Sequence, residues 1–175
     1  MQKTAKILCK NRQAGIWIWN SSAFTSNFLI AKKMPTIRKL SNSELEWANQ
    51  RHAELGFLPS ATEDYIAVAE VDGVKVGLGR LVVVDALTGE LGGMYVAPAF
   101  RGSKIADKIV AFLLQQSPYQ HLFCIPFSRV ANIYMRFGFR EVPIDVLVPT
   151  GVAHKLAWCK NEYAEPVSLL LRVAD

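Results

Sequence analysis

Apolar positions recur with the periods of strands and helices between residues 36 and 173, whereas residues 1–33 show no sustained period. Residues 65–71 and 74–84 are rich in β-branched and apolar residues, which is typical of strands. The Asp72-Gly73 dipeptide between these two runs is a strong signal for a two-residue hairpin turn. The central part of the chain therefore contains at least one antiparallel pair of strands.

The same pattern predicts an ordered series of elements along the rest of the chain. Strands are expected at residues 36–40, 65–71, 74–84, 90–96, 121–125, within 139–148 and at 167–173, and helices at 43–55, 102–116, 128–137 and 153–163. A capping box of Ser43 and Glu46 starts the first helix, a loop follows at 56–64, and a turn is expected at 87–89. The order predicts a mixed α/β domain. The helix that joins strands 90–96 and 121–125 is a crossover, so these two strands should be parallel.

The chain divides into two parts in sequence. Residues 34–175 form the expected domain, and residues 1–33 are an N-terminal extension that precedes Met34-Pro35. Two readings of the extension stay open: it is a weakly ordered or non-native segment upstream of a natural start at Met34, or it is a genuine N-terminal arm. N-terminal sequencing of the native protein separates the two.

The net charge of +5 is unevenly distributed. Residues 1–43 carry eight basic residues and no acidic residue, while residues 44–175 carry twelve basic and fifteen acidic residues, a net charge of −3. The domain therefore has no excess of positive charge with which to bind nucleic acid. A mildly acidic domain is compatible with a cationic, amine-bearing substrate.

Three cysteines, Cys9, Cys124 and Cys159, fit neither a disulfide framework nor a zinc ligand set. Reduced thiols in the cytoplasm are the simplest account of them. The sequence holds no uninterrupted run of about 20 apolar residues, so we expect no membrane span. We also expect no metal, because the three histidines are scattered.

One short segment predicts an anion site. The strand at 90–96 is followed by Arg101 and Gly102 and then by a helix start, where free N–H groups and the helix dipole attract negative charge. Lys104 and Lys108 add positive charge nearby. The segment lacks the spacing of a Walker loop and of a dinucleotide fingerprint, so it is a phosphate-binding turn of another kind.

Two runs in this region resemble the GNAT superfamily of N-acetyltransferases. Residues 90–102 (ELGGMYVAPAFRG) are similar to its cofactor strand and loop, and residues 132–139 (NIYMRFGF) are similar to its Tyr-x-x-x-Gly-Phe motif. The two runs have the family's order and spacing, and the resemblance covers roughly residues 36–173. It implies a central, mostly antiparallel mixed sheet with one splayed parallel strand pair, flanked by helices.

The resemblance implies that acetyl-coenzyme A is the acyl donor. The family loop reads Arg/Gln-x-x-Gly-x-Gly/Ala, so Arg101 and Ala106 match its ends and Lys104 stands where the family has its central glycine. Lys104 keeps the N–H donor and adds a cation, so coenzyme A binding should survive. The residues that the resemblance assigns to cofactor binding are Met94, Tyr95, Val96, Arg101, Gly102, Ser103, Lys104, Ile105, Ala106 and Asn132. Asn132 is equally well interpreted as a residue on the helix surface.

Two residues are the catalytic candidates by the same resemblance. Tyr134 matches the tyrosine that can protonate the departing thiolate, since a phenol and a thiol have comparable pKa values. Glu90 resembles the general base of some relatives, but a solvated glutamate at a strand end is an equally good interpretation. Glu63 and Asp64 are weaker candidates for the base. Arg80 either binds a substrate carboxylate or supports the cleft.

The sequence thus predicts an acetyl-CoA-dependent N-acetyltransferase that transfers the acetyl group directly to a primary amine in a ternary complex. The acceptor, a small molecule or a peptide, has no readable signature, and a monomer and a homodimer are both compatible with the sequence. The alternative is a GNAT-fold domain that binds acyl-coenzyme A as a sensor or partner module without catalysis.

Overall fold

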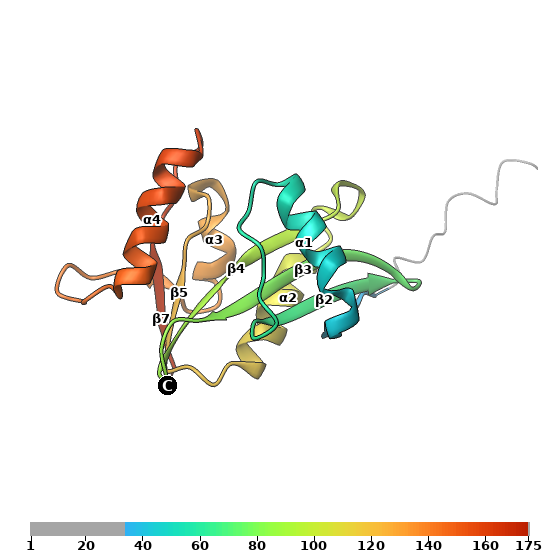
Figure 1. Cartoon of the computed structure of the whole chain (residues 1–175), viewed down its shortest axis with the longest axis horizontal. Coiled ribbons are helices and arrows are strands. Elements are labelled where there is room, and N and C mark those ends of the chain that lie inside the picture. Colours follow the sequence, from blue (N-terminus) through green and yellow to red (C-terminus); the bar gives the residue numbers. More distant parts are fainter. Residues whose placement is uncertain (1–33, 175) are drawn as a thin grey trace, which may run out of the picture. The chain divides into compact units, whose positions relative to one another are not determined.

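The protein is described here by a computed structural model, in which residues 34–174 are placed. A seven-stranded sheet with the order β1-β2-β3-β4-β5-β7-β6 forms its centre (Figure 1). Its strands are β1 (Thr36–Lys39), β2 (Tyr65–Val71), β3 (Val74–Val83), β4 (Thr88–Val96), β5 (His121–Cys124), β6 (Arg140–Glu141) and β7 (Leu170–Val173). All neighbouring strands are antiparallel except β4 and β5, which are parallel, as the crossover helix predicts.

Helices cover both faces of the sheet (Figure 1). They are α1 (Leu45–Glu54), α2 (Ile105–Gln116), α3 (Ala131–Met135) and α4 (Thr150–Glu162), with short 3-10 turns at η1 (Asn42–Glu44), η2 (Pro98–Phe100) and η3 (Ser128–Val130). Successive residues of a strand point to opposite faces, so β5 sends Leu122 into the core with α2 and α3, and Phe123 into a cluster with α4. Ile66 and Val68 of β2 pack with α1 in the same way. The predicted α/β class and its layers are confirmed.

Two glycines of β3 let α2 lie close against the sheet. A Cβ atom on Gly79 would stand 2.9 Å from Cγ2 of Ile109, and one on Gly77 would stand 3.0 Å from Cγ2 of Ile105. Both distances are shorter than a van der Waals contact. A side chain at either position would therefore push α2 away from the sheet.

The parallel strand pair separates near its middle, and this separation positions the site. The register runs from Thr88↔His121 to Leu91↔Cys124 and ends there, while β4 continues to Val96. The second half of β4 thus keeps β3 as its neighbour but has left β5. The opened edge of β4 faces the space in which the site lies.

Several predicted boundaries are wrong, each for a local reason. The turn expected at 87–89 lies earlier, because Asp85 accepts hydrogen bonds from the N–H groups of Leu87 and Thr88 and β4 begins at Thr88. The capping box uses Ser41 and Glu44 instead of Ser43 and Glu46.

Strand pairing within 139–148 is limited to β6, and β7 begins at Leu170 instead of 167. Helix α2 begins at Ile105, three residues later than predicted, α3 is limited to five residues, and α4 begins at Thr150, three residues earlier. The predictions for residues 1–33 lie outside the described residues.

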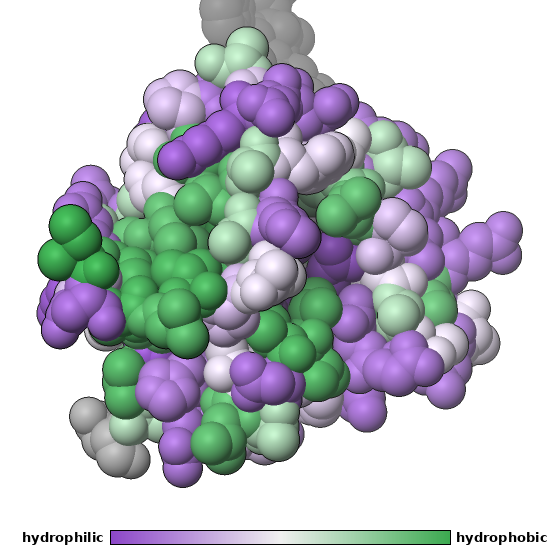
Figure 2. All heavy atoms as spheres, turned by 60° about the vertical axis from the view of Figure 1, so that its left-hand side comes forward, coloured by the Kyte–Doolittle hydropathy of each residue, from purple (hydrophilic) through white to green (hydrophobic). Residues whose placement is uncertain are grey.

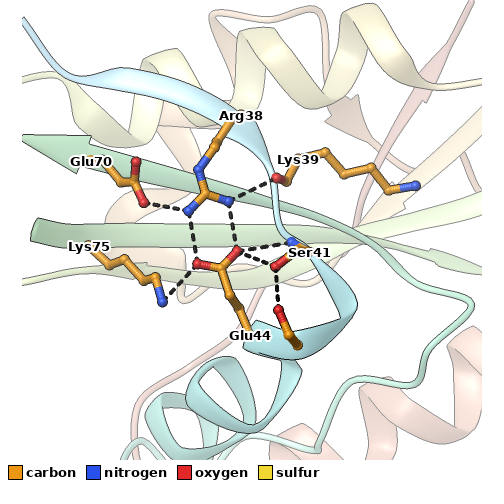
Figure 3. A network of polar contacts seen from close by, with 7 residues as sticks. Arg38, Lys39, Ser41, Glu44, Glu70 and Lys75 are labelled. Atoms are coloured by element: carbon orange, nitrogen blue, oxygen red, sulfur yellow. Dashed lines mark hydrogen bonds and ion pairs between the residues drawn. The ribbon is translucent and has the colours of Figure 1, made fainter. Parts of the chain in front are cut away.

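An ion-pair network joins β1, β2 and β3 to the start of α1 (Figure 3). Glu44 accepts hydrogen bonds from Arg38 Nη1 at 2.7 Å and Nη2 at 2.8 Å, and its Oε1 lies 2.8 Å from Lys75 Nζ. Arg38 Nη2 also contacts Glu70 at 2.5 Å. The hydrogen bonds from Arg38 and Lys75 hold the pKa of Glu44 well below its usual value. The network fixes the direction in which the chain leaves β1.

Replacing Glu44 by glutamine should lower the free energy of unfolding by about 1–2 kcal/mol at pH 7, because a bidentate pair and a helix cap are lost at a partly exposed site. Since the pKa is lowered in the folded state, this contribution is present above the usual pKa of glutamate and is lost as the pH falls through the lowered value. Denaturant unfolding at pH 7 and pH 3 measures both effects. Glu46→Gln removes the same charge from an exposed position of α1 and is the control. An equal loss in both variants would contradict the role of the network.

Candidate functional site

A cavity of about 530 Å³ occupies the space where β4 and β5 separate. Its walls come from the second half of β4, the start of α2, α3, α4 and the loop after α1. It brings together most residues that the sequence predicts: Glu90, Met94, Tyr95, Val96, Arg101, Gly102, Lys104, Ile105, Ala106 and Tyr134 line it. Ser103 and Asn132 are not among its lining residues.

The predicted anion site lies at the start of α2. Arg101, Gly102 and Lys104 line the cavity immediately before the helix, and Ile105 and Ala106 line it within the first turn, where the backbone N–H groups have no partner inside the helix. Arg101 and Lys104 are exposed, so their charges are available to an anion. The donor set of two cations and a helix N-terminus fits a pyrophosphate.

The backbone conformation of Lys104 is one that glycine favours, and the family pattern has glycine at this position. Lys104 is the N-cap of α2 and has a φ of 62° and a ψ of 22°, in the left-handed region. Glycine adopts this conformation without the clash that a Cβ atom introduces. In this chain a lysine adopts the glycine conformation, so the loop keeps its backbone path and adds a positive charge.

Lys104→Gly should therefore have two opposite effects. The free energy of unfolding should rise by about 1 kcal/mol, because the left-handed conformation costs a non-glycine residue about that much. The affinity for coenzyme A should fall about two- to fivefold, because one cation beside the pyrophosphate is lost. Thermal unfolding and calorimetric titration with coenzyme A measure the two effects.

Lys104→Ala is the matched variant, since it removes the charge and keeps the Cβ atom. It should show the loss of affinity without the gain in stability. An unchanged affinity in both variants would show that the Lys104 side chain points away from the cofactor.

The two other predicted cofactor residues are placed differently. The Ser103 hydroxyl donates to the Phe100 carbonyl and closes the turn before α2, so it serves the loop conformation. Asn132 is exposed on α3, which agrees with its interpretation as a surface residue. Neither reaches the cavity wall with its side chain.

Glu90 is buried, with 5% of its surface exposed. This contradicts the interpretation of a solvated glutamate at a strand end. Its Oε1 lies 2.5 Å from Nζ of Lys155, which comes from α4. Both residues line the cavity, and burial of a charge requires such a partner. Sequence reasoning missed Lys155, because nothing in the helical pattern of 153–163 relates it to a strand 65 residues earlier.

Tyr134 lies on α3 with 5% of its surface exposed, and its ring packs edge-on against Phe139 at 6.0 Å. Burial raises its pKa well above the usual value, and Cys124 adds to the rise. The phenol therefore stays protonated at neutral pH. Burial likewise raises the pKa of the Cys124 thiol, so this cysteine is an inert thiol instead of a nucleophile.

Arg80 supports the cleft with its two terminal nitrogens, while its buried Nε has no hydrogen-bond partner. Its Nη1 donates to Ser60 Oγ at 2.7 Å, and its Nη2 donates to the Leu58 carbonyl at 3.0 Å. Asp64 lies 3.7 Å from Nη1. Asp64, like Glu63, is absent from the cavity wall, so Glu90 is the one of these three candidate bases that lines the cavity.

Aromatic side chains line the part of the cavity beyond Glu90. The Tyr163 ring packs edge-on against three other rings, with centroid separations of 5.2 Å to Phe127, 5.5 Å to Trp158 and 6.3 Å to Phe57. The Tyr163 hydroxyl donates to the Gly56 carbonyl at 2.9 Å and so links the end of α4 to the loop after α1. Figure 2 turns the side that carries α4 forward and shows apolar residues gathered over a broad area of that face.

Comparison with known proteins agrees with this arrangement. The family model of the GNAT acetyltransferase domain matches residues 62–141, which span β2 to β6. A structure of Rv2747 from Mycobacterium tuberculosis in complex with CoA and NLQ has a TM-score of 0.65 and 24% sequence identity, covering 80% of this chain and 99% of that one. A GNAT family acetyltransferase from Elizabethkingia anophelis with acetyl-CoA bound has a TM-score of 0.57 and 18% identity, covering 80% and 98%.

N-acetylglutamate synthase from Neisseria gonorrhoeae, complexed with coenzyme A and N-acetyl-glutamate, has a TM-score of 0.61 and 18% identity. The match covers 81% of this chain but 35% of the synthase. No curated protein matches the sequence. The sheet, its splayed strand pair and the flanking helices are thus those of the GNAT fold. Residues 62–141 are thus similar in sequence to the GNAT acetyltransferase domain, and the fold of the described residues is that of the GNAT acetyltransferases.

No helix in residues 34–174 is long and apolar enough to cross a membrane. Within the same range, no group of three or more His, Cys, Asp or Glu residues is placed to hold a metal ion.

Proposed function

We propose that the protein is an acetyl-CoA-dependent N-acetyltransferase that transfers an acetyl group to a primary amine. One observation carries the proposal: a single cavity joins an anion-binding helix start, an opened strand edge, a buried tyrosine and a buried carboxylate. The family and the coenzyme A-bound structures of the same fold support acetyl-CoA as the donor. Acetyl-CoA supplies an acetyl thioester, and the residues below act on it.

The donor half of the cavity extends along β4. Arg101, Lys104 and the N–H groups at the start of α2 would hold the pyrophosphate. The backbone of Met94, Tyr95 and Val96, on the edge that β5 has left, would form hydrogen bonds with the pantetheine arm as a neighbouring strand would. With the donor held at the start of α2 and along β4, the acceptor would enter from the remaining end of the cavity, beyond Glu90.

Two side chains would move protons. Glu90 would accept a proton from the acceptor ammonium through a water molecule, which leaves a neutral amine able to attack the thioester carbonyl. The Tyr134 hydroxyl would donate its proton to the thiolate that leaves. Its raised pKa keeps that proton available at neutral pH.

The acceptor half favours a compact amine with an apolar body. Its walls include Phe57, Phe127, Trp158 and Tyr163. Its charged groups are already paired, Glu90 with Lys155 and Arg80 with Asp64. A polycationic acceptor would find no cluster of free carboxylates in this part of the cavity.

Release of free thiol from acetyl-CoA tests the proposal. The panel of acceptors should include an arylalkylamine, an α-amino acid, a polyamine and a peptide, with acetyl-CoA alone as the control. Amine-dependent thiol release together with a mass increase of one acetyl group on the acceptor supports the transferase. Tight coenzyme A binding with no turnover for any amine would favour the non-catalytic sensor instead.

A further inference from the structure

The backbone of β4 bulges at the centre of the cavity wall. Leu78 of β3 pairs with Tyr95 and Arg80 pairs with Gly92, so Gly93 and Met94 together face the single residue Gly79. Gly93 has a φ of 60°, and a glycine in this conformation is typical of a bulge with one extra residue. Gly93 and Met94 both line the cavity. The direction of the peptide between them therefore decides which polar atom the cavity presents.

A buried histidine holds one side of that peptide. His52 of α1 has none of its surface exposed, and its Nε2 lies 3.1 Å from the Gly93 carbonyl oxygen. A Cβ atom added to Gly93 would stand 2.9 Å from His52 Nε2 and 3.1 Å from Arg80 Nε. The bulge thus fits closely against these two side chains.

A chain of hydrogen bonds sets which ring nitrogen of His52 carries the proton. Arg80 has only donors, so Ser60 Oγ accepts its bond of 2.7 Å. The Ser60 hydroxyl proton is then free to point at His52 Nδ1, which lies 3.4 Å away. Nδ1 accepts, so Nε2 carries the proton and donates to the Gly93 carbonyl. Burial, aided by the charges of Arg80 and Lys155, lowers the pKa of His52 to about 4, which agrees with a neutral ring.

We propose that His52 is a positioning residue for acetyl transfer, because it fixes the Gly93–Met94 peptide so that the Met94 N–H faces the acyl donor. The described residues contain no cis peptide bond, and in a trans peptide the N–H points opposite to the carbonyl. A Gly93 carbonyl held towards α1 therefore directs the Met94 N–H away from α1. A fixed N–H beside the thioester would stabilise the negative charge that develops on its oxygen. The inference rests on the proposed function and deepens it.

The protonation state of His52 can be measured without any turnover. In the 15N spectrum of the histidine side chains of the full chain at pH 7, assigned with His52→Gln, His52 should show a protonated Nε2 and an unprotonated Nδ1. Ser60→Ala should shift the Nδ1 resonance, because it removes the donor to that atom. A cationic ring, or a proton on Nδ1, would overturn the inference.

Kinetic variants test the positioning role. His52→Leu removes the donor and should lower kcat about 10- to 100-fold, somewhat less than the loss of a stabilising donor itself. The affinity for coenzyme A, which lacks the thioester carbonyl, should change less than about twofold, since the anion loop is untouched. His52→Gln places an amide N–H near the position of Nε2 and should restore kcat to within about threefold of the wild-type value.

Ile66→Ala is the matched control, because Ile66 packs in the cluster between α1 and the sheet and makes no contact with Gly93 through a hydrogen bond. It should lower stability without the loss in kcat. If Ile66→Ala and His52→Leu lose kcat equally, or if His52→Gln recovers nothing, His52 acts through stability alone and the inference fails. A wild-type protein without amine-dependent thiol release would instead refute the proposed function, while the 15N measurement still decides the state of His52.

Discussion

Replacing Tyr134 by phenylalanine should lower kcat for acetyl transfer by about 100-fold and leave the affinity for coenzyme A unchanged. Loss of a general acid typically costs about 10²- to 10⁴-fold in rate. The variant removes one oxygen atom and keeps the ring, which packs against Phe139. The cavity wall and α3 should therefore remain as they are. Thiol release measures kcat, and calorimetric titration with coenzyme A measures the affinity.

Tyr119→Phe is the matched control for this prediction. Burial raises the pKa of Tyr119 as it does that of Tyr134, but Tyr119 packs over Gly89 and does not line the cavity. Its loss of a hydroxyl should leave kcat within about twofold of the wild-type value. Full turnover in Tyr134→Phe would remove the phenol from the mechanism, and the thiolate would then take its proton from water.

The part of the site that the sequence predicts is the part made by neighbours along the chain. The strand end, Arg101 and the helix start at Ile105 lie within a few residues of one another, so their chemistry can be interpreted without a fold. The role of Tyr134 can be predicted from the sequence for the same reason, since Tyr134 belongs to a short run with a recognisable spacing. Lys104 departs from the family pattern in the sequence itself, and its left-handed conformation is the physical reason why glycine suits this position.

The remaining parts of the site depend on contacts between distant segments. Lys155 reaches Glu90 across 65 residues, and His52 reaches Gly93 across 41. Neither pair has a sequence signature, because a lysine on a helix and a histidine on a helix are more often surface or core residues. The bulge at Gly93 is equally hidden, since the run of glycines in β4 does not show which one adopts a positive φ. Burial of Glu90 could not be predicted for the same reason: it results from α4, which follows 60 residues later in the chain.

Glu90→Gln should lower kcat at pH 7 by about 100-fold, because the acceptor ammonium would lose the group that takes its proton. Glutamine has nearly the same shape, so the wall of the cavity stays in place. The Lys155 ammonium would lose its partner, but about a fifth of its side chain is exposed and can be hydrated. The KM for acetyl-CoA should therefore change little, and the loss should appear in kcat.

The pH dependence separates a base from a residue that only shapes the cavity. As the pH rises towards the pKa of the amine, about 10 for an alkylamine, the acceptor loses its proton to solvent and no longer needs Glu90. The ratio of wild-type kcat to Glu90→Gln kcat should then shrink steadily from pH 7 to pH 9.5. Lys155→Gln keeps the carboxylate and provides the control, with a smaller loss of kcat at pH 7 than that of Glu90→Gln. A ratio that stays constant over this pH range would show that Glu90 shapes the acceptor site without accepting the proton, since a purely structural loss has no reason to depend on the protonation of the amine.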